Sequence, residues 1–394
     1  MTGSSFPQSP VASVFDATAQ PLSGRLLSMD VFRGLAVVGM IVVDNPGDDL
    51  RAYSAIRHTI WNGWSPADLI FPSFLFMVGI SLVFSYSARQ ARGETRQSLF
   101  RHAITRTLIL MGIGLFLNAF PTFELGTTRF EGVLQRIALC YLVAAVLVLW
   151  TGWRGQLAAL VLCLLGYWAL MRFAPVPGFG IPGRDIPFLD PDKNIAAWLD
   201  RKLFMGHLYN DTRDPEGIIS TIPSIATTLM GALTGHWLRT SRNLRQKASF
   251  MFLAGMAGLG AGLILDRWFP INKNLWTSSF AIFAGGFSLL AMAVLFWVLE
   301  IKRWRGSWTT PMLVFGMNAI VGFAADGLVG GLTYTYHAHL PTGKTVLWQE
   351  YANFHLLRLG MNAENTSLFY SALVVLICWL LLWPLYRKRI FIKI

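Results

Sequence analysis

The sequence predicts an all-α membrane protein, a bundle of about ten transmembrane helices. Of its 394 residues, 54% are hydrophobic and 14% are charged, and the mean hydropathy is +0.48, so the chain has more apolar surface than a soluble core can bury. The apolar residues form long runs, and a helix needs roughly 20 of them to cross the ~30 Å hydrocarbon layer. In lipid each run must satisfy its own backbone amides, which favours helices.

The apolar runs follow one another along most of the chain. They lie at about 29–45, 66–86, 103–120, 131–150, 155–173, 217–238, 248–266, 276–299, 309–330 and 366–386. We therefore expect one transmembrane domain over residues 25–394. Residues 1–24 are rich in Ser, Pro and Ala and lack the features of a secretory signal, so they are expected to form a disordered cytoplasmic tail.

The distribution of charge predicts the orientation of the bundle. With the N-terminus inside, the cytoplasmic segments hold most of the basic residues and few of the acidic ones, as the positive-inside rule requires. Both termini are then cytoplasmic. A net charge of +12 would suggest nucleic acid binding in a soluble protein, but here it indicates contact with anionic membrane lipid, and we expect no nucleic acid partner.

The loops on the opposite, periplasmic side are longer. They cover residues 46–65, 121–130, 174–216 and 331–365, and the loop 174–216 is long enough to act as a lid over a substrate. Cys140, Cys163 and Cys378 lie inside apolar runs without C-x-x-C spacing, which indicates neither a disulfide nor a zinc site. His337 and His339 lack a third ligand at suitable spacing, so no metal is expected.

The most unusual polar residues cluster around the first two spans. Asp30 and Arg33 are three residues apart on one helical face, where they either pair structurally or present Arg33 to an anionic ligand. Asp44-Asn45-Pro46-Gly47 ends the first span. Ser65-Pro66-Ala67-Asp68 then opens the second with a good N-cap residue, a proline in the first turn and a carboxylate near the positive end of the helix dipole.

The short loop between these two spans contains His58, followed closely by Trp61 and Trp64. A histidine near a membrane interface is most often an ordinary hydrogen-bonded residue, and its aromatic neighbours most often form a headgroup belt. A loop fixed at both ends can nevertheless hold a catalytic group still, which makes His58 the natural candidate.

Several motifs resemble the heparan-α-glucosaminide N-acetyltransferase family. They are S-M-D-V-F-R-G at 28–34, H-T-I-W-N-G-W-S-P-A-D-L-I-F-P at 58–72, G-V-L-Q-R-I-A at 132–138, D-P-E-G at 214–217 and I-N-K-N-L-W-T-S-S at 271–279, and the similarity extends through 315–318. The resemblance implies transfer of an acetyl group from cytoplasmic acetyl-CoA to the amine of a glucosamine residue on the far side. It is strongest to bacterial members, which implies a multi-pass protein of the bacterial inner membrane.

The resemblance also implies a catalytic group around His58. His58 would act as a general base or carry the acetyl group as an acetyl-imidazole. Asp68 lies nearby, and animal members place an asparagine where this chain has Asp44 beside Asn45, so either residue could take that polar role. Donors such as Asn45, Asn62 or Asn318 would polarise the thioester carbonyl.

Further residues are expected to bind the two substrates. Arg33, Arg101 and Arg106 are candidates for the CoA phosphates, with Asn318 on the same cofactor. The candidates for the amino sugar are Trp61, Asn62, Gln135, Arg136, Asn272, Lys273 and Trp276. For Gln135 and Arg136 the alternative is structural pairing, and for Asn272, Lys273 and Trp276 it is anchoring at the interface.

Two other functions compete with this one. An O-acetyltransferase of a periplasmic glycan would use the same donor and the same imidazole. A sugar or anion transporter would also place polar residues in the membrane, although we find no internal repeat of the kind that many transporters have. An isologous homodimer is the default assembly.

Overall fold

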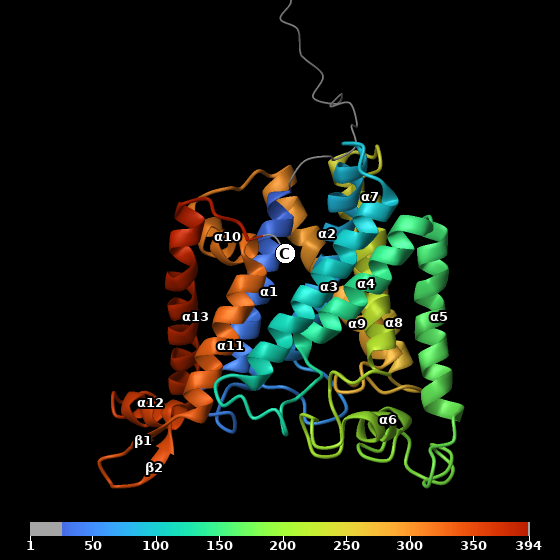
Figure 1. The fold of residues 1–394 in the computed structure, drawn as a ribbon. Helices are drawn as coiled ribbons and strands as arrows, with labels where there is room; N and C mark the ends of the chain where they lie inside the picture. The colour runs from blue at the N-terminus through green and yellow to red at the C-terminus, as the bar shows by residue number, and fades with distance from the viewer. Residues whose placement is uncertain (1–25, 393–394) are drawn as a thin grey trace, which may run out of the picture.

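The computed structural model describes residues 26–392, so the predicted tail 1–24 lies outside the described residues. The chain forms a bundle of long helices that run between two faces (Figure 1). We call one the loop face, because it holds loop 45–65, helix α6 (Ile195–Phe204), the hairpin of β1 (His337–His339) and β2 (Thr345–Leu347), and helix α12 (Trp348–Leu357). The opposite side, where α1 (Leu27–Asp44) begins and α13 (Ala363–Arg387) ends, is the basic face.

Seven helices among the described residues are long and apolar enough to cross a membrane. They are α2 (Ile70–Gln90, preceded by a 3-10 turn at Pro66–Leu69), α3 (Arg96–Ala119), α4 (Val133–Trp150), α5 (Trp153–Phe173), α8 (Leu244–Leu265), α9 (Ser278–Phe296, extended by a π turn at Trp297–Ile301) and α13 (Ala363–Arg387). The prediction of an all-α membrane bundle is therefore confirmed.

An eighth span is broken in the middle. Helix α10 (Thr310–Met317, preceded by a 3-10 turn at Ser307–Thr309) and helix α11 (Ala319–Thr335) meet at Asn318 with a bend of 79°. Together they account for the predicted span 309–330. The bend interrupts the helical hydrogen bonding at Gly316, and the side chain of Arg33 donates to the Gly316 carbonyl (3.0 Å).

The remaining two predicted spans are helices of a different character. Helix α1 (Leu27–Asp44) carries three charged residues, and α7 (Thr221–Leu238) is interrupted by serine and threonine. Both are largely buried within the bundle, so much of their surface faces other helices and not lipid. The count of about ten spans therefore stays a prediction, since composition supports seven or eight among the described residues.

Close helix packing depends on glycine at two crossings. A Cβ atom at Gly34 would lie 1.9 Å from the Met312 carbonyl oxygen, and one at Gly316 would lie 1.9 Å from that of Asp30, so α1 and α10 touch through their backbones. Gly258 of α8 similarly packs on Gly286 of α9, where an added Cβ would lie 2.8 Å from the Gly286 Cα atom.

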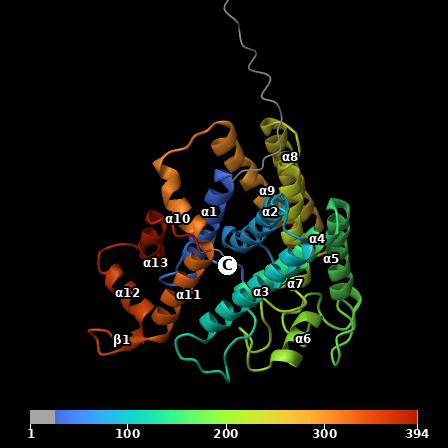
Figure 2. The same ribbon diagram turned by 45° about the horizontal axis from the view of Figure 1, so that its top comes forward.

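Short elements cover the loop face (Figures 1 and 2). Helix α6 (Ile195–Phe204) lies within the long loop 174–216, and a 3-10 turn (Ser54–Ile56) lies in loop 45–65. Strands β1 (His337–His339) and β2 (Thr345–Leu347) pair in antiparallel fashion with Ala338 opposite Val346, and helix α12 (Trp348–Leu357) follows. Trp61 donates a hydrogen bond to the Leu189 carbonyl (2.9 Å), so the long loop rests on loop 45–65.

Candidate active site

Loop 45–65 is fixed at both ends, as its sequence predicts. At its start, the Gly47 amide donates to the Ser367 carbonyl (3.4 Å), and the side chain of Gln349 donates to the Pro46 carbonyl. At its end, Ser65 and Asp68 form a capping box, and Ser65 Oγ donates to the Arg57 carbonyl (2.7 Å). The position of the loop is thus set by helices α1, α2, α12 and α13.

His58 and Asp68 form the centre of the site. His58 Nδ1 lies 2.7 Å from Asp68 Oδ1. The Asp68 side chain is fully buried, whereas His58 is 40% exposed. The carboxylate also accepts bonds from Thr59 Oγ1 (2.5 Å) and from the Ser65 amide (2.9 Å). Because an ionised carboxylate can only accept, Nδ1 of the imidazole carries the proton, and Nε2 is the ring nitrogen that can act as an acceptor.

Lys273 completes this group from a loop more than 200 residues away. Its Nζ atom lies 3.1 Å from both ring nitrogens of His58 and 3.9 Å from Asp68 Oδ1. Burial lowers the pKa of Lys273, while the carboxylates of Glu216, Asp68 and Asp44 act in the opposite direction. The sequence suggested Lys273 as a sugar contact, and the structure places it against the imidazole.

Asn272 and Trp276 shape the loop that carries Lys273. Asn272 is fully buried, accepts a bond from the Leu275 amide (2.9 Å) and donates to Asn62 Oδ1 (3.2 Å), which joins this loop to loop 45–65. Trp276 is also fully buried, with its ring against Phe71 and Phe280 and its backbone in the left-handed region (φ 49°). Both residues are placed to position the loop, and the Trp276 ring offers no exposed face to a sugar.

Asp44 and Asn45 have different environments. The Asn45 side chain is buried, and its Nδ2 donates to the Ile41 carbonyl (3.0 Å) and to Asp326 Oδ1 (2.6 Å). Asp44 is exposed and lies close enough to His58 and Lys273 to interact with them electrostatically. Asn45 is thus part of the buried helix packing, whereas Asp44 faces the imidazole group.

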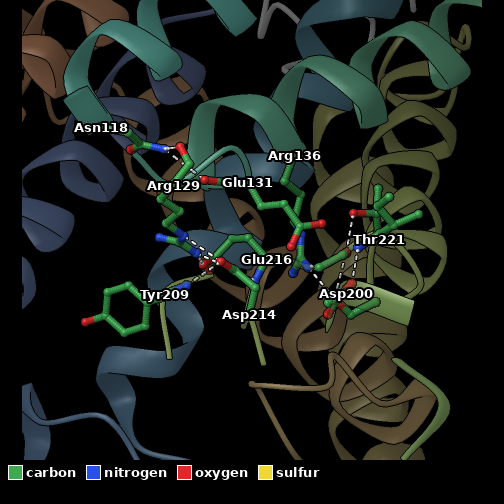
Figure 3. Close-up of polar contacts among 12 residues, drawn as sticks. Asn118, Arg129, Glu131, Arg136, Asp200, Tyr209, Asp214, Glu216 and Thr221 are labelled. Atoms are coloured by element: carbon green, nitrogen blue, oxygen red, sulfur yellow. Dashed lines mark hydrogen bonds and ion pairs between the residues drawn. The ribbon is translucent and has the colours of Figure 1, made fainter. Parts of the chain in front are cut away.

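A second charged group lies beside the site, at the start of α4 (Figure 3). Arg129 donates to the carboxylates of Asp214 and Glu216, both from the D-P-E-G motif. Arg136 is almost fully buried, donates to Ser220 Oγ and to the Gly217 carbonyl, and lies over the ring of Trp276 (5.1 Å). These bonds tie the start of α4 to the start of α7.

This group contains acidic residues that sequence reasoning missed. Burial, helped by the neighbouring Asp200 and Asp214, raises the pKa of Glu131 to about 9, and burial likewise raises that of Asp200 to about 7. Neither oxygen of the Glu131 carboxyl has a hydrogen-bond partner among the described residues. Glu131 directly precedes the G-V-L-Q-R-I-A motif, which was the only signal that could have drawn attention to it.

The space next to this charged group is small. Asp200 and Asp214 line a cavity of about 10 Å³ together with Trp61 and Arg213, and the guanidinium of Arg213 lies 5.3 Å from the Trp61 ring centroid. This volume suits a single water molecule. Gln135, in the first turn of α4, packs its amide against Gly114 and Gly132, where an added Cβ would lie 2.4 and 2.9 Å away.

A much larger cavity of about 540 Å³ opens from the basic face. Its basic residues are Arg33, Arg89, Arg92, His102 and Arg106. Its lining continues to Phe74, Leu110 and Leu134, the last of which lies in the first turn of α4 on the loop-face side. No residue of loop 45–65 lines it. Phe74 follows Asp68 by six residues, about 9 Å along a helix, so a short gap separates this cavity from His58.

The residues suggested for CoA are distributed unequally around this cavity. Arg106 lies over Tyr141 (4.6 Å), with its Nε atom unpartnered among the described residues, and Arg33 binds Ser81 Oγ (2.8 Å) and the Gly316 carbonyl (3.0 Å). Arg101 is exposed and does not line the cavity. Arg89 and Arg92 do line it and were missed, although they belong to the same basic stretch of sequence.

Asn318 borders the cavity but binds the chain itself. Its Nδ2 donates to the Ile390 carbonyl (3.1 Å), and its Oδ1 accepts a bond from the Ile392 amide (3.0 Å). The segment after α13 thus turns back to the bundle, and Ile392 contributes to the lining of the cavity. The break between α10 and α11 that carries Asn318 lies toward the basic face, whereas loop 45–65 with His58 lies at the loop face.

The fold and the site together define a class: a polytopic membrane protein with a histidine–carboxylate pair on one face and an arginine-lined cavity that opens on the other. Residues 25–265 match the family described as heparan-alpha-glucosaminide N-acetyltransferase, catalytic. The chain is also similar to heparan-alpha-glucosaminide N-acetyltransferase of Homo sapiens, with 30% identity over an alignment 433 positions long, and to that of Mus musculus, with 28% over 434 positions. The chain belongs to the heparan-alpha-glucosaminide N-acetyltransferase family.

The alignments cover nearly all of this chain but only part of each relative. They include 95% and 96% of the chain, against 60% of the human protein and 62% of the mouse protein. The family match over residues 25–265 includes His58, Asp68 and Asp44, and it ends before the loop of Lys273.

Proposed function

We propose that the protein is a membrane acetyltransferase. It takes acetyl-CoA at the basic face, on the cytoplasmic side, and transfers the acetyl group to the amino group of glucosamine or of a glucosamine-containing sugar at the loop face. The observation that carries the proposal is the arrangement of a His58–Asp68 pair at one face and a cavity lined by arginines that opens at the other. The positive-inside rule and family membership support the orientation and the reaction.

The two ends of the cavity suit the two ends of the donor. The phosphates of acetyl-CoA need cations, which Arg33, Arg92 and Arg106 provide. The pantetheine arm is thin and mostly apolar, and the deeper lining by Phe74, Leu110 and Leu134 is apolar as well. For the thioester to reach His58, side chains around Phe74 and Leu134 must move apart.

The chemistry at His58 follows from its tautomer. With Nδ1–H donating to Asp68, Nε2 can accept the amine proton as the nitrogen attacks the thioester, or it can attack the carbonyl and form an acetyl-imidazole. Labelled acetyl-CoA without sugar distinguishes the two routes. A covalent label that is absent in His58→Ala supports the intermediate, and full turnover without any label supports direct transfer.

A single assay tests the proposed function. Purified protein in detergent should release CoA from acetyl-CoA only when glucosamine is present, and His58→Ala should abolish the release. His339→Ala, which removes an exposed histidine of the β1–β2 hairpin, is the matched control and should retain activity. Sugar-independent release, or full activity in His58→Ala, would reject the proposal.

The choice of acceptor separates the alternatives. N-acetylglucosamine has no free amine, so its acetylation would indicate an O-acetyltransferase. Uptake of sugar into vesicles without acetyl-CoA would indicate a transporter. Localisation to the bacterial inner membrane and a homodimeric assembly remain part of the proposal, and fractionation and size measurements in detergent test them.

A further inference from the structure

Lys273 has contacts that an ordinary sugar-binding lysine does not need. Its Nζ atom lies 3.1 Å from His58 Nε2, the atom that must accept a proton or attack the donor. We propose that Lys273 is a catalytic residue that donates a hydrogen bond to the oxyanion formed when the thioester carbonyl is attacked beside His58. The inference rests on the proposed acetyl transfer and adds a role for a residue outside the His58–Asp68 pair.

The other donors considered for this role are already engaged. Both hydrogens of the Asn45 amide are used by the Ile41 carbonyl and Asp326. Asn318 donates to the Ile390 carbonyl on the basic face. Asn62 accepts from Asn272, and its own amide group is exposed to solvent, where water competes for it. Lys273 is the donor that combines proximity to Nε2 with burial.

The position of Lys273 is held from several sides. The Trp276 amide donates to the Lys273 carbonyl (3.0 Å) in a tight turn, and Trp276 Nε1 donates to Thr227 Oγ1 of α7 (3.2 Å). The Gly63 amide donates to the Ile271 carbonyl (2.7 Å), which links the turn to the His58 loop. Trp276 adopts a left-handed conformation (φ 49°) that costs free energy for a bulky residue, and its complete burial maintains it.

The electrostatic environment suits an oxyanion donor. The Lys273 side chain is only 15% exposed, so few water molecules compete for its N–H groups. Glu216, Asp68 and Asp44 surround it with negative charge that favours the ammonium form, while burial acts against that form. A poorly hydrated ammonium gains more from a developing negative charge than a hydrated one, because little solvent must be displaced.

The same donor serves either route of acetyl transfer. In direct transfer the amine nitrogen bonds to the carbonyl carbon, the π electron pair moves to the oxygen, and Nε2 takes the amine proton. When the carbonyl re-forms, the C–S bond breaks and the CoA thiolate leaves and takes that proton. In the acetyl-imidazole route Nε2 bonds to the carbonyl carbon, the C–S bond breaks and CoA leaves as the thiolate. The amine nitrogen then bonds to the same carbon, the C–Nε2 bond breaks, and the freed imidazole takes the amine proton. The oxyanion forms next to Lys273 once in each half-reaction.

Steady-state kinetics of three variants test the inference. Lys273→Met should lower kcat by roughly 10²- to 10³-fold, with the KM for glucosamine changed less than about three-fold, because the lost interaction exists only in the transition state. Lys273→Arg, which keeps a cationic donor, should recover at least about ten-fold of the loss. Asn274→Ala, on the same loop, is the control and should keep the wild-type kcat.

The outcomes separate the inference from the proposed function. If wild-type protein lacks sugar-dependent CoA release, the proposed function fails whatever Lys273 does. Suppose that wild-type protein is active and His58→Ala is not. A raised KM with unchanged kcat in Lys273→Met would then make Lys273 a sugar contact and overturn the inference. An unchanged kcat together with an unchanged KM would overturn it as well. Thermal unfolding in detergent shows whether Lys273→Met is folded. If it is not, Lys273→Gln takes its place, and an unchanged kcat in Lys273→Gln overturns the inference.

The pH dependence gives a readout that a structural role would not change. If the ammonium is the donor, wild-type kcat should fall at alkaline pH as Lys273 loses its proton. This alkaline decline should move to higher pH in Lys273→Arg and disappear in Lys273→Met. A decline that is identical in all three proteins would contradict the inference.

Discussion

Replacement of Asp68 by asparagine separates the proposed catalytic role of this residue from its structural role. Asp68 accepts bonds from the amide and hydroxyl of Thr59, from the Ser65 amide and from His58 Nδ1. An alanine would leave several buried donors without an acceptor, at about 1–3 kcal/mol each, and would endanger the fold itself. An asparagine keeps the oxygen that bonds Ser65 and Thr59, so we expect a loss of only about 1–2 kcal/mol in unfolding free energy.

The effect of Asp68→Asn on activity should be much larger. An amide nitrogen placed against Nδ1 donates a hydrogen bond, so the imidazole proton moves to Nε2 and blocks the lone pair that the reaction needs. We expect sugar-dependent CoA release to fall by roughly 10³- to 10⁴-fold. Asp49→Asn, an exposed aspartate in the same loop, serves as the control. Activity of Asp68→Asn within ten-fold of wild type, in folded protein, would refute the assignment of the tautomer.

Two further predictions concern the basic cavity and the acidic group. Arg106→Ala should raise the KM for acetyl-CoA about ten-fold, because it removes one charged donor from the cavity. Arg101→Ala removes an equal charge outside the cavity and should leave this KM unchanged. Equal effects of both changes would mean that the KM for acetyl-CoA depends on the total positive charge of the basic face and not on a contact inside the cavity. The raised pKa of Glu131, about 9, means that the folded protein retains a proton that the unfolded chain releases. The stability of the folded protein should therefore decline as pH rises from about 5 to about 9. Glu131→Gln should make this decline less steep in thermal unfolding. The same pH dependence in Glu131→Gln and in wild-type protein would contradict the prediction.

Much of the fold could be predicted from sequence because lipid imposes simple rules. Long apolar runs predicted the seven helices that composition supports and the broken span at 309–330. The sequence also predicted the positions of helices α1 and α7, but their polar residues mean that composition alone does not mark them as membrane spans. Sequence hydropathy cannot distinguish a helix that is buried by protein from one that faces lipid, because only the packed structure shows which surfaces are covered.

The candidate site was predictable where its residues are close in sequence. His58, Ser65 and Asp68 belong to one loop and one helix start, where capping rules apply. Lys273 reaches His58 from a different loop, and no local pattern gives that distance. Trp276 was a candidate sugar contact because sugars are usually held by amides and aromatic faces, yet its side chain is buried in the core.

The arginines of α3 show where helical geometry favours one candidate over another. Arg101 and Arg106 are five residues apart, about 140° around a helix, so both could not face one cavity. His102 and Arg106 are four apart and share a face, and both line the cavity. The helical period therefore favours Arg106 over Arg101 as a cavity residue, because Arg106 shares its helical face with His102.

The broken span at Asn318 joins the two ends of the described chain. Arg33, from the first helix, binds the Gly316 carbonyl at the break, and Asn318 binds the backbone of Ile390 and Ile392 from the last segment. Arg33 therefore supplies a hydrogen bond that the interrupted helix lacks, and Asn318 holds the segment after α13 beside the break. Arg33 and Ile392 both line the basic cavity, so its wall is complete only when these two segments, far apart in sequence, have come together.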